Sequence, residues 1–165
     1  MCQCISFISY NWNSHPISSN SFILKRNTIY VMTQQGILLC GHGSKKQYNK
    51  ELIVNTAKRI SDTHPQYIVK CGFMEANEPT ISQALDEFRT EEISALAVVP
   101  LFLARGVHID EDIPRILGFE EGQKVGTFKT NNGEVPLSYA APIGEHPFLA
   151  DVMVASAEDA FKLIQ

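Results

Sequence analysis

The fold is decided by the stretch GILLCGHGS at residues 36–44, where an apolar run ends in a glycine-rich turn that carries His42. A second stretch of this kind, LAVVPLFLARGVH at residues 96–108, ends in His108. Short apolar runs bounded by turn residues are typical of strands that are covered on both faces of a parallel sheet. Ligands of open parallel sheets bind at the carboxyl ends of the strands. The sequence therefore predicts that two imidazoles, far apart in the chain, face one bound metal ion or small molecule.

Strand-like and helix-like segments alternate from Thr33 onward. This order predicts an α/β domain with a mainly parallel, four-stranded sheet and right-handed crossovers. The segment 120–136 is expected to form a loop or irregular hairpin, with a turn at Asn132-Gly133. The expected strands are 36–41, 67–74, 93–104 and 137–141, and the expected helices are 47–63, 78–89, 109–117 and 146–163.

The helices show apolar residues at helical spacing, which predicts one buried face on each. In the second helix Pro79 is expected near the first turn. In the third, Pro114 is expected to shorten or kink the helix before Gly118. The residues expected to be buried are Leu52, Ile53, Thr56, Ala57 and Ile60 in the first helix, Ile81, Leu85 and Phe88 in the second, and Leu149, Val152, Met153, Ala157 and Ala160 in the last.

Composition and charge exclude several classes of protein. The chain has 165 residues, 44% of them hydrophobic and 19% charged, as expected for one globular domain of ordinary size. A net charge of −4, with no basic cluster along an expected helix, argues against a nucleic-acid partner. The longest apolar run is too short and too interrupted to span a membrane. Cys40 and Cys71 lie in strand-like runs, where buried thiols indicate a reducing cytoplasm.

The first 32 residues differ from the rest of the chain. They are rich in asparagine and serine, keep neither a strand nor a helix period, and lack the features of a secretory signal. Two interpretations stay open. Met32 is the natural start and residues 1–31 are an upstream extension, or residues 1–31 form a short arm that is disordered or loosely docked. In either case the functional domain is expected to span residues 33–165.

Each residue of the predicted site also has an ordinary structural explanation. The glycines beside His42 permit a tight turn and the close approach of a flat ligand, but a lone Gly-His-Gly is often only a turn. The turn could also cradle phosphate, although neither the Walker nor the dinucleotide spacing is present. Asp110, Glu111 and Asp112 after His108 are either favourable helix-start charges or attract a cation. Glu78 is either another helix-start carboxylate or a proton acceptor.

Five motifs occur in order along the chain: Gly41-His42-Gly43-Ser44, Met74-Glu75-x-x-Glu78-Pro79-Thr80, Val99-Pro100-x-Phe102-Leu103-Ala104-x-Gly106-x-His108, Asp112-Ile113-Pro114 and Ala141-Pro142-Ile143-Gly144. Taken together, these motifs resemble the short sirohydrochlorin chelatases, the small cobalt and nickel chelatases of archaea. That group is related to the bacterial siroheme and cobalamin chelatases and to ferrochelatase. The resemblance runs from about Gln35 to the C-terminus, and the loop 120–133 lacks the histidines of some relatives.

The resemblance implies a small three-layer chelatase-like domain that inserts nickel or cobalt into sirohydrochlorin. Such an enzyme uses no organic cofactor, feeds the nickel coenzyme of methanogenesis or cobalamin, and is a homodimer. It implies that His42 is metal ligand and proton acceptor, that His108 is the second metal ligand, and that Glu78 relays a proton and contacts substrate. The flat ring and its carboxylates would meet Leu101, Phe102, Leu103, Ala104, Arg105 and Gly106, with Lys45 and Lys46 as further candidates.

Three alternatives remain open at the level of the sequence. Iron would make the chain an enzyme of the siroheme branch, because ligand type alone does not select between these metals. The same crevice could serve a non-catalytic carrier of metal or tetrapyrrole. The glycine-rich turn could instead bind phosphate, although the Walker lysine is missing.

Overall fold

The computed structural model describes residues 22–25, 28–31 and 33–164, and side chains from residue 33 onward. The chain divides into two compact units, Met1–Met32 and Thr33–Gln165. In the first unit, strands β1 (Phe22–Lys25) and β2 (Thr28–Val31) pair antiparallel, a hairpin that the sequence did not predict. Each strand is a short run rich in β-branched and aromatic residues, too short to show a period. The proposed start at Met32 and residues 1–21 lie outside the described residues.

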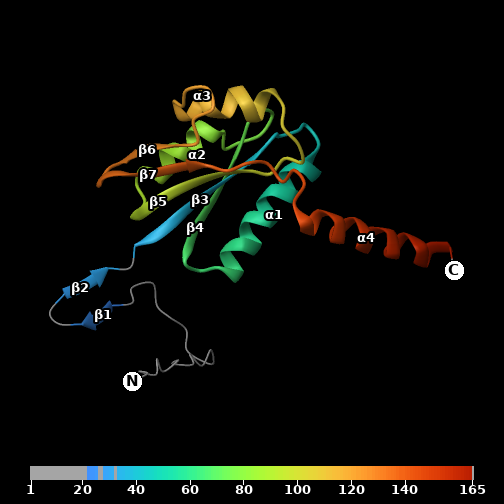
Figure 1. The fold of residues 1–165 in the computed structure, drawn as a ribbon, viewed down its shortest axis with the longest axis horizontal. Coiled ribbons are helices and arrows are strands. Elements are labelled where there is room, and N and C mark those ends of the chain that lie inside the picture. Colours follow the sequence, from blue (N-terminus) through green and yellow to red (C-terminus); the bar gives the residue numbers. More distant parts are fainter. Residues whose placement is uncertain (1–21, 26–27, 32, 165) are drawn as a thin grey trace, which may run out of the picture. The chain divides into compact units, whose positions relative to one another are not determined.

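The second unit is built on a five-stranded sheet in the order β4-β3-β5-β7-β6 (Figure 1). Four strands run parallel, as predicted, and β6 is antiparallel at the edge. The prediction of four strands was therefore one short. The strands are β3 (Gln34–Gly41), β4 (Tyr67–Phe73), β5 (Ile93–Pro100), β6 (Val125–Thr130) and β7 (Gly133–Tyr139).

The additional strand comes from the segment 120–136, for which a loop or irregular hairpin was expected. β6 and β7 form a hairpin in which Thr130 pairs with Gly133. Its turn is Asn131-Asn132, one residue before the predicted Asn132-Gly133. Phe128 and Thr130 are buried, whereas Thr127 and Lys129 are exposed. β6 thus alternates between a buried and a solvent-facing side, a pattern that a search for continuous apolar runs does not detect.

Helices cover both faces of this sheet, which gives the predicted three layers (Figure 1). α1 (Gln47–Thr63) has the predicted bounds and packs Ile53 and Ala57 against Leu39 and Phe73 on one face. Leu52, expected to be buried, is 57% exposed. The opposite face is covered by α2 (Ile81–Phe88) and α3 (Ile113–Leu117), which contribute Ile81, Ala84, Leu85, Phe88 and Ile113 to the core.

The second helix begins later than predicted, and the third is interrupted. α2 starts after a capping box formed by Thr80 and Gln83, so Pro79 precedes the helix instead of lying in its first turn. The third helix is divided. A π-helical turn, η1 (His108–Asp112), precedes α3, which ends at Gly118 with φ 72°. Pro114 has no N–H to donate to the preceding turn, which is why the sequence indicated a shortened helix here.

The prediction of a buried face on the last helix was wrong. α4 (Pro147–Phe161) has no buried residue, and Val152 and Met153 are each 55% exposed. α4 extends away from the sheet and continues into the short helical turn η2 (Lys162–Ile164) (Figure 1). Its apolar side chains are thus mostly exposed, although Leu149 is half-buried. Within the part of the chain that the structure describes, no helix is long and apolar enough to cross a bilayer.

Candidate functional site

Three loops meet where the central parallel strands end. β3 lies between β4 and β5, so the residues that follow these strands reach one edge of the sheet. Backbone hydrogen bonds join the loops: Glu75 N donates to the His42 carbonyl over 3.1 Å, and Leu101 N donates to the Cys40 carbonyl over 2.8 Å. The loops therefore hold their side chains in fixed relative positions.

His42 and His108 lie next to each other at this edge. Their ring centroids are 4.8 Å apart and the ring planes make an angle of 77°, an edge-to-face arrangement. The side chains are 45% and 35% exposed, respectively, so both rings remain accessible from solvent. The structure thus brings together the two histidines that the sequence singled out. Imidazole nitrogens are good ligands for cobalt, nickel, iron and zinc.

Glu75 is the carboxylate nearest to His42, and the sequence reasoning did not name it as a site residue. Its Oε1 lies 3.4 Å from Nδ1 of His42 and its side chain is 60% exposed. Its place directly after Met74, at the end of the strand beside β3, was the signal that could have identified it. Glu78, the predicted residue, lines neighbouring hollows with Pro79 and Thr80.

The turn after β3 is fixed by close contacts that only glycine permits. Gly43 has φ 88°, and a Cβ at this position would come within 1.8 Å of the Glu75 carbonyl oxygen. Two asparagines hold the turn: the Gly43 N–H donates to Asn49 over 3.2 Å, and the Ser44 N–H donates to Asn77 over 2.8 Å. An open hollow of about 600 Å³ results, lined by His42, Gly43, Ser44, Lys45, Asn49, Glu75 and Ala76.

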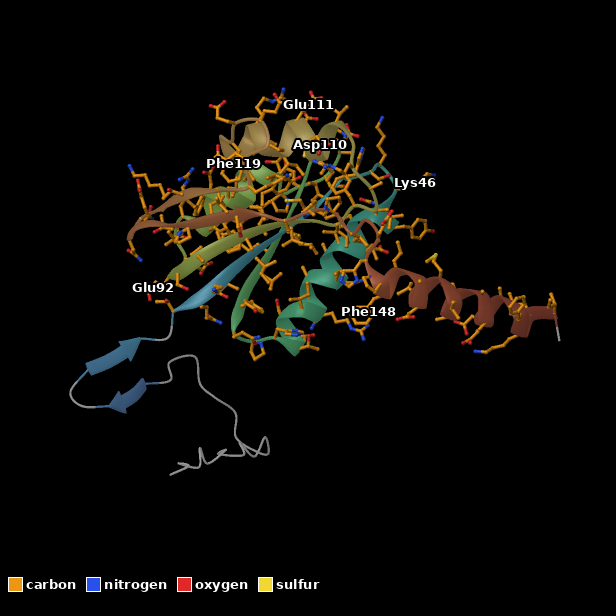
Figure 2. All side chains as sticks on the ribbon, viewed as in Figure 1. Lys46, Glu92, Asp110, Glu111, Phe119 and Phe148 are labelled. Atoms are coloured by element: carbon orange, nitrogen blue, oxygen red, sulfur yellow. The ribbon has the colours of Figure 1, made fainter. Side chains whose placement is uncertain are left out.

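The three acids after His108 have different neighbours. Asp112 Oδ2 lies 2.8 Å from Nδ1 of His108, and its other oxygen accepts from Arg115. Asp110 pairs with Arg105 over 3.0 Å. Glu111 is exposed, and Figure 2 shows Glu111 and Asp110 close to α3. Asp112 is thus the acid in direct contact with the candidate metal ligand.

The segment after β5 forms an apolar rim beside the histidines. The Phe102 ring lies 6.2 Å from the His42 ring, and Leu101 is half-buried like Phe102. Leu103 is 64% exposed, and Ala104 and Gly106 are exposed as well. The carbonyls of Phe102 and Leu103 accept hydrogen bonds from Ile143 N and Gly144 N over 2.9 and 2.8 Å. The rim is therefore held by the loop that follows β7.

Among the predicted basic residues, Lys45 is nearest to the histidines because it lines the His42 hollow. Arg105 lies on a separate hollow with Lys124 and is 71% exposed. Lys46 is exposed at the start of α1 (Figure 2). Among the described residues, no group of three or more histidine, cysteine, aspartate or glutamate side chains is arranged to hold a metal ion.

Two further polar groups lie beneath the site. Cys40 is fully buried, and burial raises the pKa of its thiol far above the usual range, which keeps it protonated. The Tyr139 hydroxyl donates to the Ile109 carbonyl over 2.9 Å, and burial raises its pKa also. The tyrosine thus anchors the η1 turn to β7 from below.

Comparison with known proteins identifies relatives over most of the chain. The family model described as CbiX matches residues 36–160. The sirohydrochlorin cobaltochelatase of Methanosarcina barkeri is 43% identical over 130 residues, which cover 78% of this chain and 99% of the relative. The sirohydrochlorin cobaltochelatase of Methanococcoides burtonii is 42% identical over 122 residues, which cover 74% and 93%.

Solved structures show the same fold. SirB from Bacillus subtilis with Fe3+ superimposes on this chain with a TM-score of 0.61 at 24% identity. The match covers 77% of this chain and 47% of the SirB chain. The resemblance that the sequence motifs indicated is confirmed by the extent of the family match and by the identity to the archaeal relatives. This chain belongs to the CbiX family.

Proposed function

We propose that this chain is a chelatase that inserts a divalent metal ion, cobalt or nickel, into sirohydrochlorin. The observation that carries the proposal is the pair of imidazoles, 4.8 Å apart between ring centroids and open to solvent. Two protein ligands leave coordination positions free for the nitrogens of an incoming macrocycle. The names of the archaeal relatives support sirohydrochlorin as the substrate and cobalt as one of its metals.

Metal insertion requires that the ion lose water and that two pyrrole N–H groups lose their protons. His42 and His108 replace part of the hydration shell of the ion with imidazole nitrogen. Glu75 lies 3.4 Å from His42 and is exposed, so it is placed to accept pyrrole protons and pass them to water. The proton relay that the family resemblance implied for Glu78 is therefore assigned to Glu75, the carboxylate in contact with His42.

The substrate is a flat ring that carries several carboxylates, and the surroundings of the histidines suit such a ligand. Phe102 and Leu103 offer apolar surface to the ring. Lys45 beside His42, and Arg105 at the end of the rim, provide positive charge for the carboxylates. As the family resemblance implies, the proposed reaction uses no organic cofactor.

A metal-by-metal insertion assay tests the proposal. Purified protein is mixed with excess sirohydrochlorin and with Co2+, Ni2+ or Fe2+, and the absorbance of the metallated product is followed. We expect the amount of metallated sirohydrochlorin to exceed the amount of enzyme many times over with cobalt or nickel. Product that stops at one equivalent per chain would indicate a carrier, and turnover with iron alone would indicate the siroheme branch. Cobalt product would feed cobalamin, and nickel product the methanogenic coenzyme.

The proposed enzyme is a homodimer in a reducing cytoplasm, where the thiols of Cys40 and Cys71 stay free. α4 supports a second copy as partner, because an apolar helix with no buried residue is normally covered in the assembled protein. Charge favours α1 of the second copy. α4 carries the acids Asp151, Glu158 and Asp159. α1 has a small excess of positive charge, Lys50, Lys58 and Arg59 against Glu51 and Asp62, and it exposes Tyr48 and Leu52.

Oligomeric state tests this part of the proposal. Val152→Asp places a charge on the apolar surface of α4 and is expected to shift the protein from dimer to monomer in sedimentation velocity. Asn132→Asp adds the same charge to the exposed turn between β6 and β7 and should leave the dimer intact. A wild-type monomer at assay concentration, or a Val152→Asp dimer as tight as the wild type, would contradict it.

A further inference from the structure

Asp112 lies between the His108 ring and a guanidinium group. One carboxylate oxygen is 2.8 Å from Nδ1 of His108, and the other accepts a hydrogen bond from Arg115. The Asp112 side chain is only 20% exposed, whereas that of Arg115 is 75% exposed. The carboxylate is thus fixed from the solvent side and directed at one defined nitrogen of the ring.

This contact defines which nitrogen of His108 carries the hydrogen. An ionised carboxylate can only accept hydrogen bonds, so Nδ1 must be the donor, and the neutral ring keeps its lone pair on Nε2. We propose that Asp112 is a positioning residue that holds His108 in the Nδ1–H tautomer and so presents Nε2 to the substrate metal. This inference rests on the proposed function, because it takes His108 as a ligand of that metal.

The backbone around Asp112 is anchored well enough to give the contact a fixed geometry. His108 and Asp112 stand at the two ends of η1, four residues apart, on the same side of the turn. Ile109 is 2% exposed and Ile113 is fully buried, so the turn is fixed in the core. The Tyr139 hydroxyl holds the Ile109 carbonyl over 2.9 Å. A carboxylate on such a turn orients the ring without a large entropy cost.

His42 reaches the same tautomer by different contacts. Its Nδ1 lies 3.0 Å from the Gly43 carbonyl oxygen and 3.4 Å from the Glu75 carboxylate, and both groups are acceptors. Both rings therefore keep Nε2 free. The two acids differ in restraint, because Asp112 is tied to Arg115 while Glu75 is 60% exposed. This difference suits Asp112 to orient a ligand and Glu75 to carry protons.

Histidine tautomers can be read directly by NMR of metal-free protein labelled with ¹⁵N in its imidazoles, at mildly alkaline pH where the rings are neutral. We expect Nδ1–H for His108 in the wild type. In Asp112→Asn an amide N–H can donate to Nδ1, which favours the Nε2–H tautomer. Co2+ affinity should then fall about 10–100-fold, the usual effect of removing such a partner of a metal ligand. Sirohydrochlorin affinity should not change.

Glu111→Gln is the matched control, since Glu111 is an exposed acid on the same turn. It should change neither the tautomer nor Co2+ affinity. An Nε2–H tautomer for His108 in the wild type would overturn the inference, whether or not Asp112→Asn folds. Wild-type tautomer and Co2+ affinity in a folded Asp112→Asn protein would also overturn it. An Nδ1–H tautomer in a protein that inserts no metal would reject the proposed function alone.

Discussion

The imidazole rings of His42 and His108 lie edge to face with their centroids 4.8 Å apart. This proximity follows from the sheet. β3 and β5 are parallel neighbours in which Cys40 pairs with Pro100, so the two strands end side by side at the same edge of the sheet. The segment 101–107 leads from β5 to η1, whose first residue, His108, lies beside His42. Two histidines distant in sequence are thus brought together by strand order.

The turn at Gly43 provides a direct test of how the site is built. Gly43→Ala would force a side chain into a left-handed backbone position and against the Glu75 carbonyl. We expect destabilisation of about 1–3 kcal/mol, measured by urea unfolding, together with loss of activity. Gly106→Ala, which meets no atom within 4 Å, should leave the unfolding free energy unchanged. Equal stability of the two variants would show that the turn adapts.

The two glutamates after β4 are expected to differ in their contribution to turnover. Glu75→Gln removes the carboxylate nearest His42 and should lower kcat by about 100-fold or more, the usual scale for loss of a proton acceptor. Glu78→Gln should lower it much less, because Glu75 is the carboxylate that contacts His42. Steady-state insertion kinetics of both variants measure this. A larger loss in Glu78→Gln would return the proton relay to Glu78.

A chain that starts at Met32 should keep the melting temperature and the activity of the full chain. The reason is that Thr33–Gln165 forms a compact unit of its own. Thermal unfolding followed by circular dichroism, together with the insertion assay, makes the comparison. A large fall in melting temperature would show that residues 1–31 stabilise the domain, as a docked arm would.

Much of this fold could be predicted because local and global signals agree. α1 has its predicted bounds, and the apolar runs of β3 and β5 became the core of the sheet. α4 was predicted to bury residues that are exposed. An apolar periodicity indicates that a helix has an apolar face, but it does not show what covers that face. β6 was missed because edge strands alternate between polar and apolar residues.

The proximity of the two histidines could be predicted from the sequence, but which carboxylates contact them could not. A histidine that directly follows a strand end is placed by the strand alone, as in His42. Which of several nearby acids approaches it depends on loop geometry. Asn77 N bonds to the Glu75 carbonyl over 2.7 Å, in a tight turn that keeps Glu75 at His42. Asp112 faces His108 through the π-helical turn, which sequence periodicity did not indicate.

His108→Ala should weaken metal binding much more than sirohydrochlorin binding. A neutral ring nitrogen is a good metal ligand but offers little to the carboxylates of the substrate, which Lys45 and Arg105 are better suited to bind. Calorimetry with Co2+ and fluorescence quenching with sirohydrochlorin give the two affinities separately. Collapse of sirohydrochlorin affinity with unchanged Co2+ affinity would assign His108 to the macrocycle instead.

Co2+ titration of four proteins tests most directly whether His42 and His108 hold one ion. The proteins are the wild type, His42→Ala, His108→Ala and the double variant, each checked for an unchanged circular dichroism spectrum. Residues that share one ligand show coupled effects, and independent residues show additive ones. If the two histidines hold one ion, each single substitution weakens Co2+ binding nearly as much as both together. Strictly additive losses, or one ion retained per remaining histidine, would contradict it.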